Sequence, residues 1–304
     1  MLAQVLTLGA GDPLAADWWR YRFIQFTFQH WIPAGAGLLA MGLASWLGLA
    51  WGGTPRERLV RLGFAVPALA YAAFVSAWYL APSRLDLARS LPLHLCDLAV
   101  ILGPATLIWR RRWMRGLLFY WGIGLSTQAF ITPTVRVGWG DTEYYFFWAS
   151  HVAIVGSAFY DFTAGGFRPR WSDFARSVAI SMGWMMGVFA LNLTIEGANY
   201  GYVGNVVPRN PTIIDKLGPW PGRVAILVAI VTAAFAAFTW LCRGLERVEG
   251  RWGFGPRRAL VLVVLGLGLA MGTVGAVEVA RGALRRPAPH DANKASTNVS
   301  GSKG

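Results

Sequence analysis

Eight apolar stretches, each close to the thickness of a bilayer, constrain this chain more than any other feature. They cover approximately residues 31–51, 57–80, 91–109, 113–131, 143–162, 174–196, 222–242 and 259–280. A helix needs about 20 apolar residues to cross the hydrocarbon core. The stretches lack the alternation of barrel strands, and lipid cannot satisfy the edges of an open sheet. The pattern therefore predicts an all-α polytopic membrane bundle of about seven core helices plus one extra C-terminal helix.

The composition agrees with lipid as the main solvent of the chain. Hydrophobic residues make up 55% and charged residues 14% of the sequence, whereas soluble domains carry about 25% charged residues. The net charge is +13, but no basic domain stands apart from the apolar stretches, so we expect no nucleic-acid partner. We interpret the Arg residues as determinants of topology that touch anionic lipid head groups.

Four regions follow from this pattern. Residues 1–30 form an aromatic N-terminal interfacial segment without the basic start of a cleaved signal peptide. Residues 31–243 form the membrane core, and residues 244–286 form a loop and the extra C-terminal helix. Residues 287–304 are small and polar, which predicts a disordered tail.

The distribution of basic residues predicts an N-terminus outside the membrane. With that orientation most Arg residues of the core loops, including Arg110, Arg111 and Arg112, lie inside. This agrees with the positive-inside rule. The last span opposes it, because Arg281 and the basic residues after it would then lie outside.

Polar residues gather near the outer ends of the predicted spans. Ionisable groups within membrane spans are costly and suggest a functional site. Two interpretations are open: a common polar cavity near the outer leaflet, which we favour, or side chains that reach the interface independently. The candidate residues are His30, His94, Cys96, Asp97, Gln128, His151, Asn192 and Glu196.

The cluster around Cys96 divides between two helix faces. His94 and Asp97 are three residues apart and share a face, whereas Cys96 points elsewhere. Asp97 either orients His94 through a hydrogen bond or forms a structural contact with it. The better partner for Cys96 is a His from another helix, and His151 lies deepest in its span.

A nucleophilic thiol at this position would need a base and a polar pocket, because the thiolate is the attacking species. The start of a helix favours the thiolate. The alternative is that Cys96 is a small apolar filler. Cys242 ends a span on the inner side, so the two thiols face opposite leaflets and form no disulfide.

Other chemistry has little support in the sequence. There is no HExxH, no CxxC pair and no phosphate-binding glycine loop, so we expect no metal and no cofactor. Gly122 and Gly124 indicate close helix packing. The loop over residues 196–223 predicts either a lid over the outer cavity or an ordinary interfacial loop.

Several motifs together resemble one family. LPLHLCDLA, FYWGIGLSTQAFITP, FFWASHVAIV and the later NYGYV and DKLGPWP look like the YwaF-like bacterial integral membrane proteins, over about residues 23–243. That family is similar to a vertebrate transmembrane acyltransferase acting on ether phospholipids. The resemblance implies Cys96 as nucleophile, His151 as general base and a place in the bacterial inner membrane.

The leading hypothesis is an integral membrane lipid acyltransferase or acyl-ester hydrolase acting on phospholipids near the outer leaflet. Cys96 attacks the ester carbonyl, His151 moves the proton, and Gln128 and Asn192 are candidate oxyanion donors. The alternative is a transporter or solute-binding protein that uses His94, Asp97 and Glu196. A non-enzymatic scaffold is the third interpretation. The sequence predicts no oligomeric state.

Overall fold

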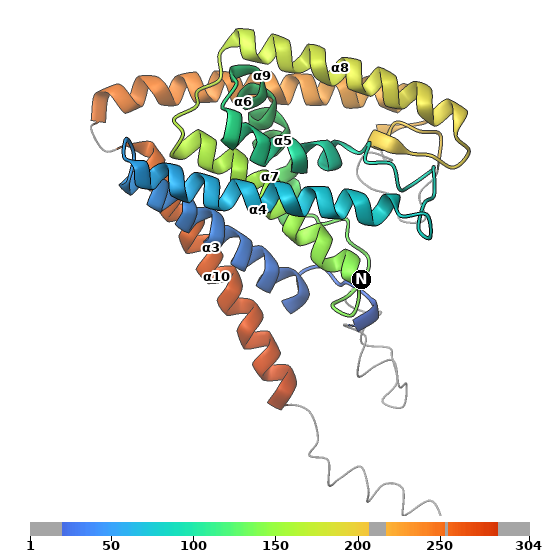
Figure 1. Cartoon of the computed structure of the whole chain (residues 1–304), viewed down its shortest axis with the longest axis horizontal. Coiled ribbons are helices and arrows are strands. Elements are labelled where there is room, and N and C mark those ends of the chain that lie inside the picture. Colours follow the sequence, from blue (N-terminus) through green and yellow to red (C-terminus); the bar gives the residue numbers. More distant parts are fainter. Residues whose placement is uncertain (1–19, 207–216, 253–254, 285–304) are drawn as a thin grey trace, which may run out of the picture.

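Helices make up all the regular secondary structure of the part that the computed structural model describes, residues 20–206, 217–252 and 255–284. The predicted all-α bundle is confirmed. Two 3-10 segments, η2 and η3, and one π-helical segment, η1, accompany the α-helices (Figure 1). The elements are α3 (Phe28–Ala50), α4 (Pro55–Leu80), α5 (Leu95–Trp109), α6 (Arg112–Leu118), η1 (Phe119–Leu125), η2 (Ser126–Phe130), α7 (Thr142–Thr163), α8 (Trp171–Thr194), η3 (Tyr200–Tyr202), α9 (Gly222–Trp252) and α10 (Pro256–Leu284).

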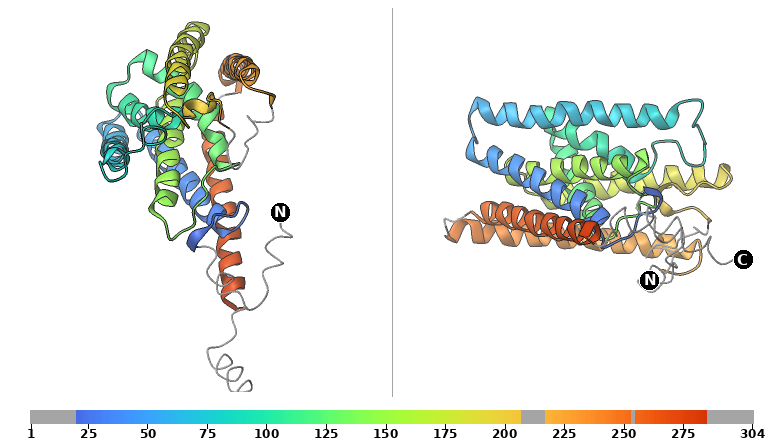
Figure 2. Two further views of the ribbon diagram at one scale, coloured as in Figure 1. Left: turned by 90° about the vertical axis from the view of Figure 1, so that its right-hand side faces the viewer. Right: turned by 90° about the horizontal axis from the view of Figure 1, so that it is seen from below.

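Five of these helices are long and apolar enough to cross a bilayer, namely α3, α4, α8, α9 and α10. The protein is therefore a multi-pass membrane protein. Successive helices run in opposite senses, and α3 and α10 cross α4, α8 and α9 at an angle (Figures 1 and 2). We call the end at which α3, α5 and α7 begin the Cys96 end, and the opposite end, where α4, α6 and α8 begin, the arginine end.

The interior helix is α7, which contacts α3, α5 and η1. It lies in the middle of the bundle in Figure 1. Most residues of α7 are buried, including the polar His151, Ser157 and Asp161. Polar side chains are tolerated here because neighbouring helices, and not lipid, surround them.

The fourth predicted span, residues 113–131, is helical but is not one regular α-helix. The segment passes from the α-helix α6 to the π-helix η1 and then to the 3-10 helix η2. At the change, both the backbone N–H and the hydroxyl of Ser126 donate to the Trp121 carbonyl. Gly122 packs so closely on α7 that an added Cβ would lie 2.5 Å from Ala158 Cβ. Gly122 therefore does mark close packing, and it lies where the helix changes from one type to another.

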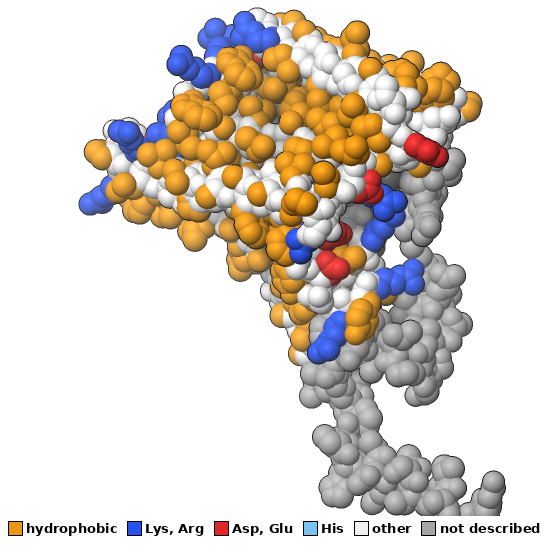
Figure 3. All heavy atoms as spheres, turned by 45° about the vertical axis from the view of Figure 1, so that its right-hand side comes forward, with side chains coloured by type: hydrophobic (Ala, Val, Ile, Leu, Met, Phe, Trp, Pro, Cys, Tyr) orange, Lys and Arg blue, Asp and Glu red, His pale blue; other side chains and the backbone are white. Residues whose placement is uncertain are grey.

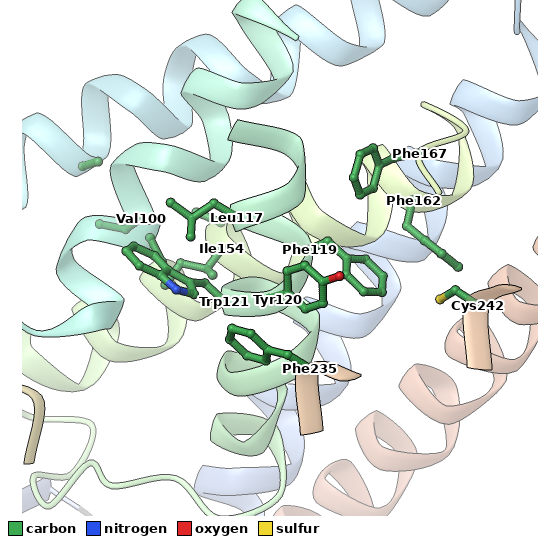
Figure 4. Packing of buried hydrophobic residues seen from close by; sticks show 13 residues of the cluster. Val100, Leu117, Phe119, Tyr120, Trp121, Ile154, Phe162, Phe167, Phe235 and Cys242 are labelled. Carbon is green, nitrogen blue, oxygen red and sulfur yellow. The ribbon is translucent and has the colours of Figure 1, made fainter. Parts of the chain in front are cut away.

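Aromatic packing fixes α9 against the broken segment. The ring of Tyr120 stacks on Phe235 at 4.6 Å, and its hydroxyl forms a 2.7 Å hydrogen bond with Thr239. Trp121 and Ile154 belong to the same buried cluster (Figure 4). The cluster joins α5, η1, α7 and α9, so the start of α5 rests on a packed support.

The C-terminal helix α10 packs tightly on α3, and the two lie side by side in both figures (Figures 1 and 2). Glycines allow the approach: a Cβ at Gly35 would lie 2.6 Å from the backbone of Gly272, and one at Gly268 would lie 2.9 Å from that of Leu39. Small residues at such contacts let membrane helices pack backbone to backbone.

The surface has the character expected of a membrane-embedded bundle. Hydrophobic side chains cover much of the face in Figure 3, and Arg side chains gather at its edges. Leu59, Phe74, Met186 and Trp240 are each more than half exposed. Apolar surface of this extent is stable when lipid covers it.

Candidate functional site

The helix α5 begins with a carboxylate cap. Asp97 lies in the first turn, and its Oδ2 accepts the backbone N–H of His94 at 2.9 Å. A negative charge at this position also interacts favourably with the helix dipole. The predicted proximity of His94 and Asp97 is therefore present, but the hydrogen bond runs to the backbone of His94 and not to its imidazole.

The imidazole of His94 instead lies against two tyrosines of the loop after α8. Its ring centroid is 5.3 Å from that of Tyr200 and 5.6 Å from that of Tyr202. The Tyr200 hydroxyl donates to the Leu87 carbonyl and accepts the Leu91 N–H. This loop is thereby held over the segment that leads into α5.

Asn192 fixes the same loop to α8. Its amide donates to the Tyr200 carbonyl, and its carbonyl accepts the Tyr200 N–H, both at 2.9 Å. The described part of the loop thus packs on the start of α5, which is compatible with the predicted lid. Residues 207–216 of the predicted lid lie outside the described residues.

Cys96 is half-buried in the first turn of α5. Its thiol interacts with the hydroxyl of Ser126, which is itself held by the Trp121 carbonyl at 2.8 Å. The phenol of Tyr202 lies near Cys96 and Asp97 and hydrogen-bonds the Thr134 side chain. The thiol therefore faces the junction of η1 and η2 and the loop after α8.

His151 is buried in α7, and one of its ring nitrogens is hydrogen-bonded. Nδ1 lies 2.7 Å from the Phe147 carbonyl one turn earlier. A carbonyl only accepts, so Nδ1 carries the proton and Nε2 keeps a lone pair. This tautomer is the one that a general base requires.

Cys96 and His151 lie at nearly the same level of the bundle. Tyr79 of α4 lies near both Asp97 and Glu143, so α5 and α7 start at the same end. Gly103 of α5 faces Ser157 of α7, where an added Cβ would lie 3.1 Å away. Cys96 precedes Gly103 by about 10 Å and His151 precedes Ser157 by about 9 Å at 1.5 Å per residue. Among the described residues, no hydrogen bond joins the thiol to the imidazole.

His30 lies away from this group, at the start of α3. Nδ1 accepts the Phe26 N–H at 3.2 Å, and Nε2 lies 3.0 Å from the Phe130 carbonyl. The ring also stacks on Trp31 and Trp148. With both nitrogens bonded and only 1% of the residue exposed, His30 ties α3 to η2.

Two further predicted members of the polar cavity face outward. The side chains of Gln128 in η2 and of Glu196 after α8 are exposed. The structure thus brings His94, Cys96 and Asp97 together, places His151 level with them, and leaves His30, Gln128 and Glu196 elsewhere. Among the described residues, no three His, Cys, Asp or Glu side chains come together as ligands for a metal ion.

Ser126 and Tyr202 are neighbours of the thiol that sequence reasoning missed. Ser126 stands inside the quoted motif FYWGIGLSTQAFITP, and Tyr202 inside NYGYV. Both motifs were noted, but only the folded chain brings them to Cys96. Polar residues within a stretch that otherwise fits a membrane span were the available signal.

One comparison with known proteins identifies a relationship. The model of the TMEM164 family matches residues 25–239. The matched region contains every candidate site residue and leaves out α10. No curated protein and no solved structure matches the chain.

Proposed function

The chain belongs to the TMEM164 family of membrane proteins, and from this premise we propose that it is an integral membrane lipid acyltransferase or acyl-ester hydrolase with Cys96 as nucleophile. The observation that carries the proposal is the tautomer of the His151 imidazole. Its Nδ1–H is held by Phe147, so the free lone pair on Nε2 can accept a proton at the level of Cys96.

In the proposed reaction His151 Nε2 removes the thiol proton, and Sγ forms a bond to the carbonyl carbon of a phospholipid ester. Collapse of the tetrahedral intermediate breaks the carbon–oxygen bond, and the proton on Nε2 passes to the departing alcohol. Water or the hydroxyl of a second lipid then attacks the thioester, gives its proton to His151, and releases the acyl group. The imidazole finally returns that proton to the thiolate.

The neighbours of Cys96 have supporting roles in this proposal. Ser126, held by Trp121, fixes the orientation of the thiol. Tyr202 is the favoured oxyanion donor because its phenol lies near Cys96, whereas the predicted donor Asn192 is engaged with Tyr200. A hydrogen-bond donor aimed at the developing charge is the requirement.

The transporter alternative has less support from the geometry. It needs His94, Asp97 and Glu196 around one solute. Asp97 accepts the backbone N–H of His94, and Glu196 is exposed. The proposal places the enzyme in the bacterial inner membrane with the N-terminus and the Cys96 end outside; a reporter fused after α9 tests this orientation.

The nucleophile is tested by labelling the purified protein with a phospholipid that carries a thiol-directed electrophile. Labelling should be lost in Cys96→Ser and kept in the control Cys242→Ser, whose thiol is buried on another helix. His151→Gln should label far more slowly. Labelling of Cys96→Ser at the wild-type rate would overturn the proposal, and solute-dependent stabilisation of that variant would favour the transporter.

A further inference from the structure

A pocket outside the Cys96 site lies where the beginning of α3 meets the last turns of α10. It is lined by Phe26, Trp31, Thr273, Val274, Val277, Glu278 and Arg281. Figure 1 shows α10 running past the start of α3 at this point. The five α10 residues recur every three to four positions and therefore share one face of the helix.

One part of the pocket suits a cation. Glu278 contributes a carboxylate, which also interacts with the backbone N–H of Phe28 at the start of α3. Beside it, the rings of Phe26 and Trp31 lie 5.7 Å apart, and the Trp31 indole donates to the Phe26 carbonyl at 3.0 Å. A carboxylate next to fixed aromatic rings binds ammonium groups through charge and cation–π attraction.

The other part suits an anion above an apolar wall. Arg281 follows Glu278 by three residues, yet no ion pair joins them within the described part of the chain. A guanidinium binds phosphate with two parallel hydrogen bonds. Val274 and Val277 lie one turn before these charged groups, and both are exposed.

We propose that this pocket binds the head group of an aminophospholipid, with its phosphate at Arg281 and its ammonium among Glu278, Phe26 and Trp31. The two charges of phosphoethanolamine are joined by two carbons, and the two α10 charges are one turn apart. The exposed valines then contact the acyl chains. A lipid is favoured over a free phosphate because the pocket lies between two helices that are apolar enough to span the membrane.

The pocket combines residues from inside and outside the family match. The family match ends at residue 239, so Glu278 and Arg281 belong to a helix outside the matched region, whereas Phe26 and Trp31 belong to the matched part. The lipid would therefore bridge the family core and α10, and it would do so independently of any chemistry at Cys96.

Native mass spectrometry of the purified full-length protein tests the proposal with three probes: phosphatidylethanolamine, phosphatidylglycerol and diacylglycerol. The wild type should bind phosphatidylethanolamine about tenfold more tightly than phosphatidylglycerol, and diacylglycerol least. Glu278→Gln should make the first two nearly equal, since it removes the charge that selects the ammonium. Arg281→Gln should weaken both phospholipids.

The matched controls are Glu246→Gln and Arg243→Gln, which make the same charge changes on α9. Each should keep the wild-type order of affinities. Trp31→Leu should also reduce the preference for the amine, which tests the aromatic part without altering a charge. Equal binding of the two phospholipids by the wild type would overturn the proposal. So would an unchanged preference in Glu278→Gln, or full displacement of lipid by millimolar glycerophosphoethanolamine.

Discussion

Buried polar groups at the two ends of the bundle differ in how completely they are bonded. At the arginine end they are paired: Arg115 Nε lies 3.0 and 2.9 Å from the two carboxylate oxygens of Asp161, and Arg112 Nη2 lies 2.5 Å from Asp173. Glu57 contacts both Arg61 and the Tyr160 hydroxyl at 3.0 Å. Each of these three acids has a cationic partner within its own network.

At the Cys96 end the thiol of Cys96 and the imidazole of His151 are only partly engaged. His151 uses one ring nitrogen and keeps the other, and Cys96 interacts with an uncharged hydroxyl. A fully bonded network resists change, whereas a spare lone pair can accept a proton. The contrast suggests that the arginine end supports the fold and the Cys96 end is available for chemistry.

The largest effect expected from this contrast is on turnover. His151→Gln should lower the release of acyl chains from phospholipid vesicles by 10²–10⁴-fold, the usual contribution of a general base, with little change in the unfolding temperature. His30→Gln is the matched control, because both nitrogens of His30 are already bonded. His30→Gln should lower stability and leave the rate per folded molecule unchanged. If His151→Gln instead lowered only stability and kept the rate, His151 would have no role in the mechanism.

At the arginine end the large effect should be on stability. Asp161→Ala leaves the Arg115 guanidinium, whose side chain is 17% exposed, without its carboxylate. Breaking a buried pair in this way costs about 3–5 kcal/mol, which unfolding in detergent micelles can measure. Replacing both residues with apolar side chains should recover much of the loss. If Asp161→Ala instead reduced turnover per folded molecule, the separation between the two ends would fail.

Much of the fold could be predicted because apolar runs carry their own length signal. The predicted spans 31–51, 57–80 and 143–162 match α3, α4 and α7 within a few residues. The sequence does not distinguish segment 113–131 from a regular α-helix, because π and 3-10 turns bury the same apolar residues as an α-helix. The bonds of Ser126 to Trp121 that mark the break are local, and composition does not reveal them.

The site was less predictable because it depends on how helices pack. Sequence spacing separates Cys96 from His94, and in the structure His94 packs on Tyr200 and Cys96 faces Ser126, although Tyr202 lies near both. The relative level of Cys96 and His151 follows from the contact of Gly103 with Ser157, which no pattern along one helix encodes. Arg115 similarly looked like a topology signal, but it is the partner of Asp161.

A smaller effect should follow from Ser126→Ala, which removes the hydroxyl next to the thiol. One hydrogen bond contributes about 1 kcal/mol, so turnover should fall about fivefold if the hydroxyl orients the thiol. Ser126→Thr should restore the rate, because it keeps the hydroxyl. Loss of stability without loss of turnover would show that Ser126 only supports the η1–η2 junction. Kinetics and thermal unfolding of the same samples distinguish this structural role from orientation of the thiol.

The smallest effect should come from Asp97→Asn. The amide oxygen can still accept the His94 N–H, now at 2.9 Å, so the change removes mainly the favourable interaction of a charge with the start of α5. That interaction contributes about 0.3–1 kcal/mol, and denaturant unfolding should detect a loss of this size with nearly unchanged turnover. A fall in turnover as large as that of His151→Gln would instead make Asp97 part of the chemistry. In that case the partly engaged groups of the Cys96 end would include a carboxylate as well as a thiol and an imidazole.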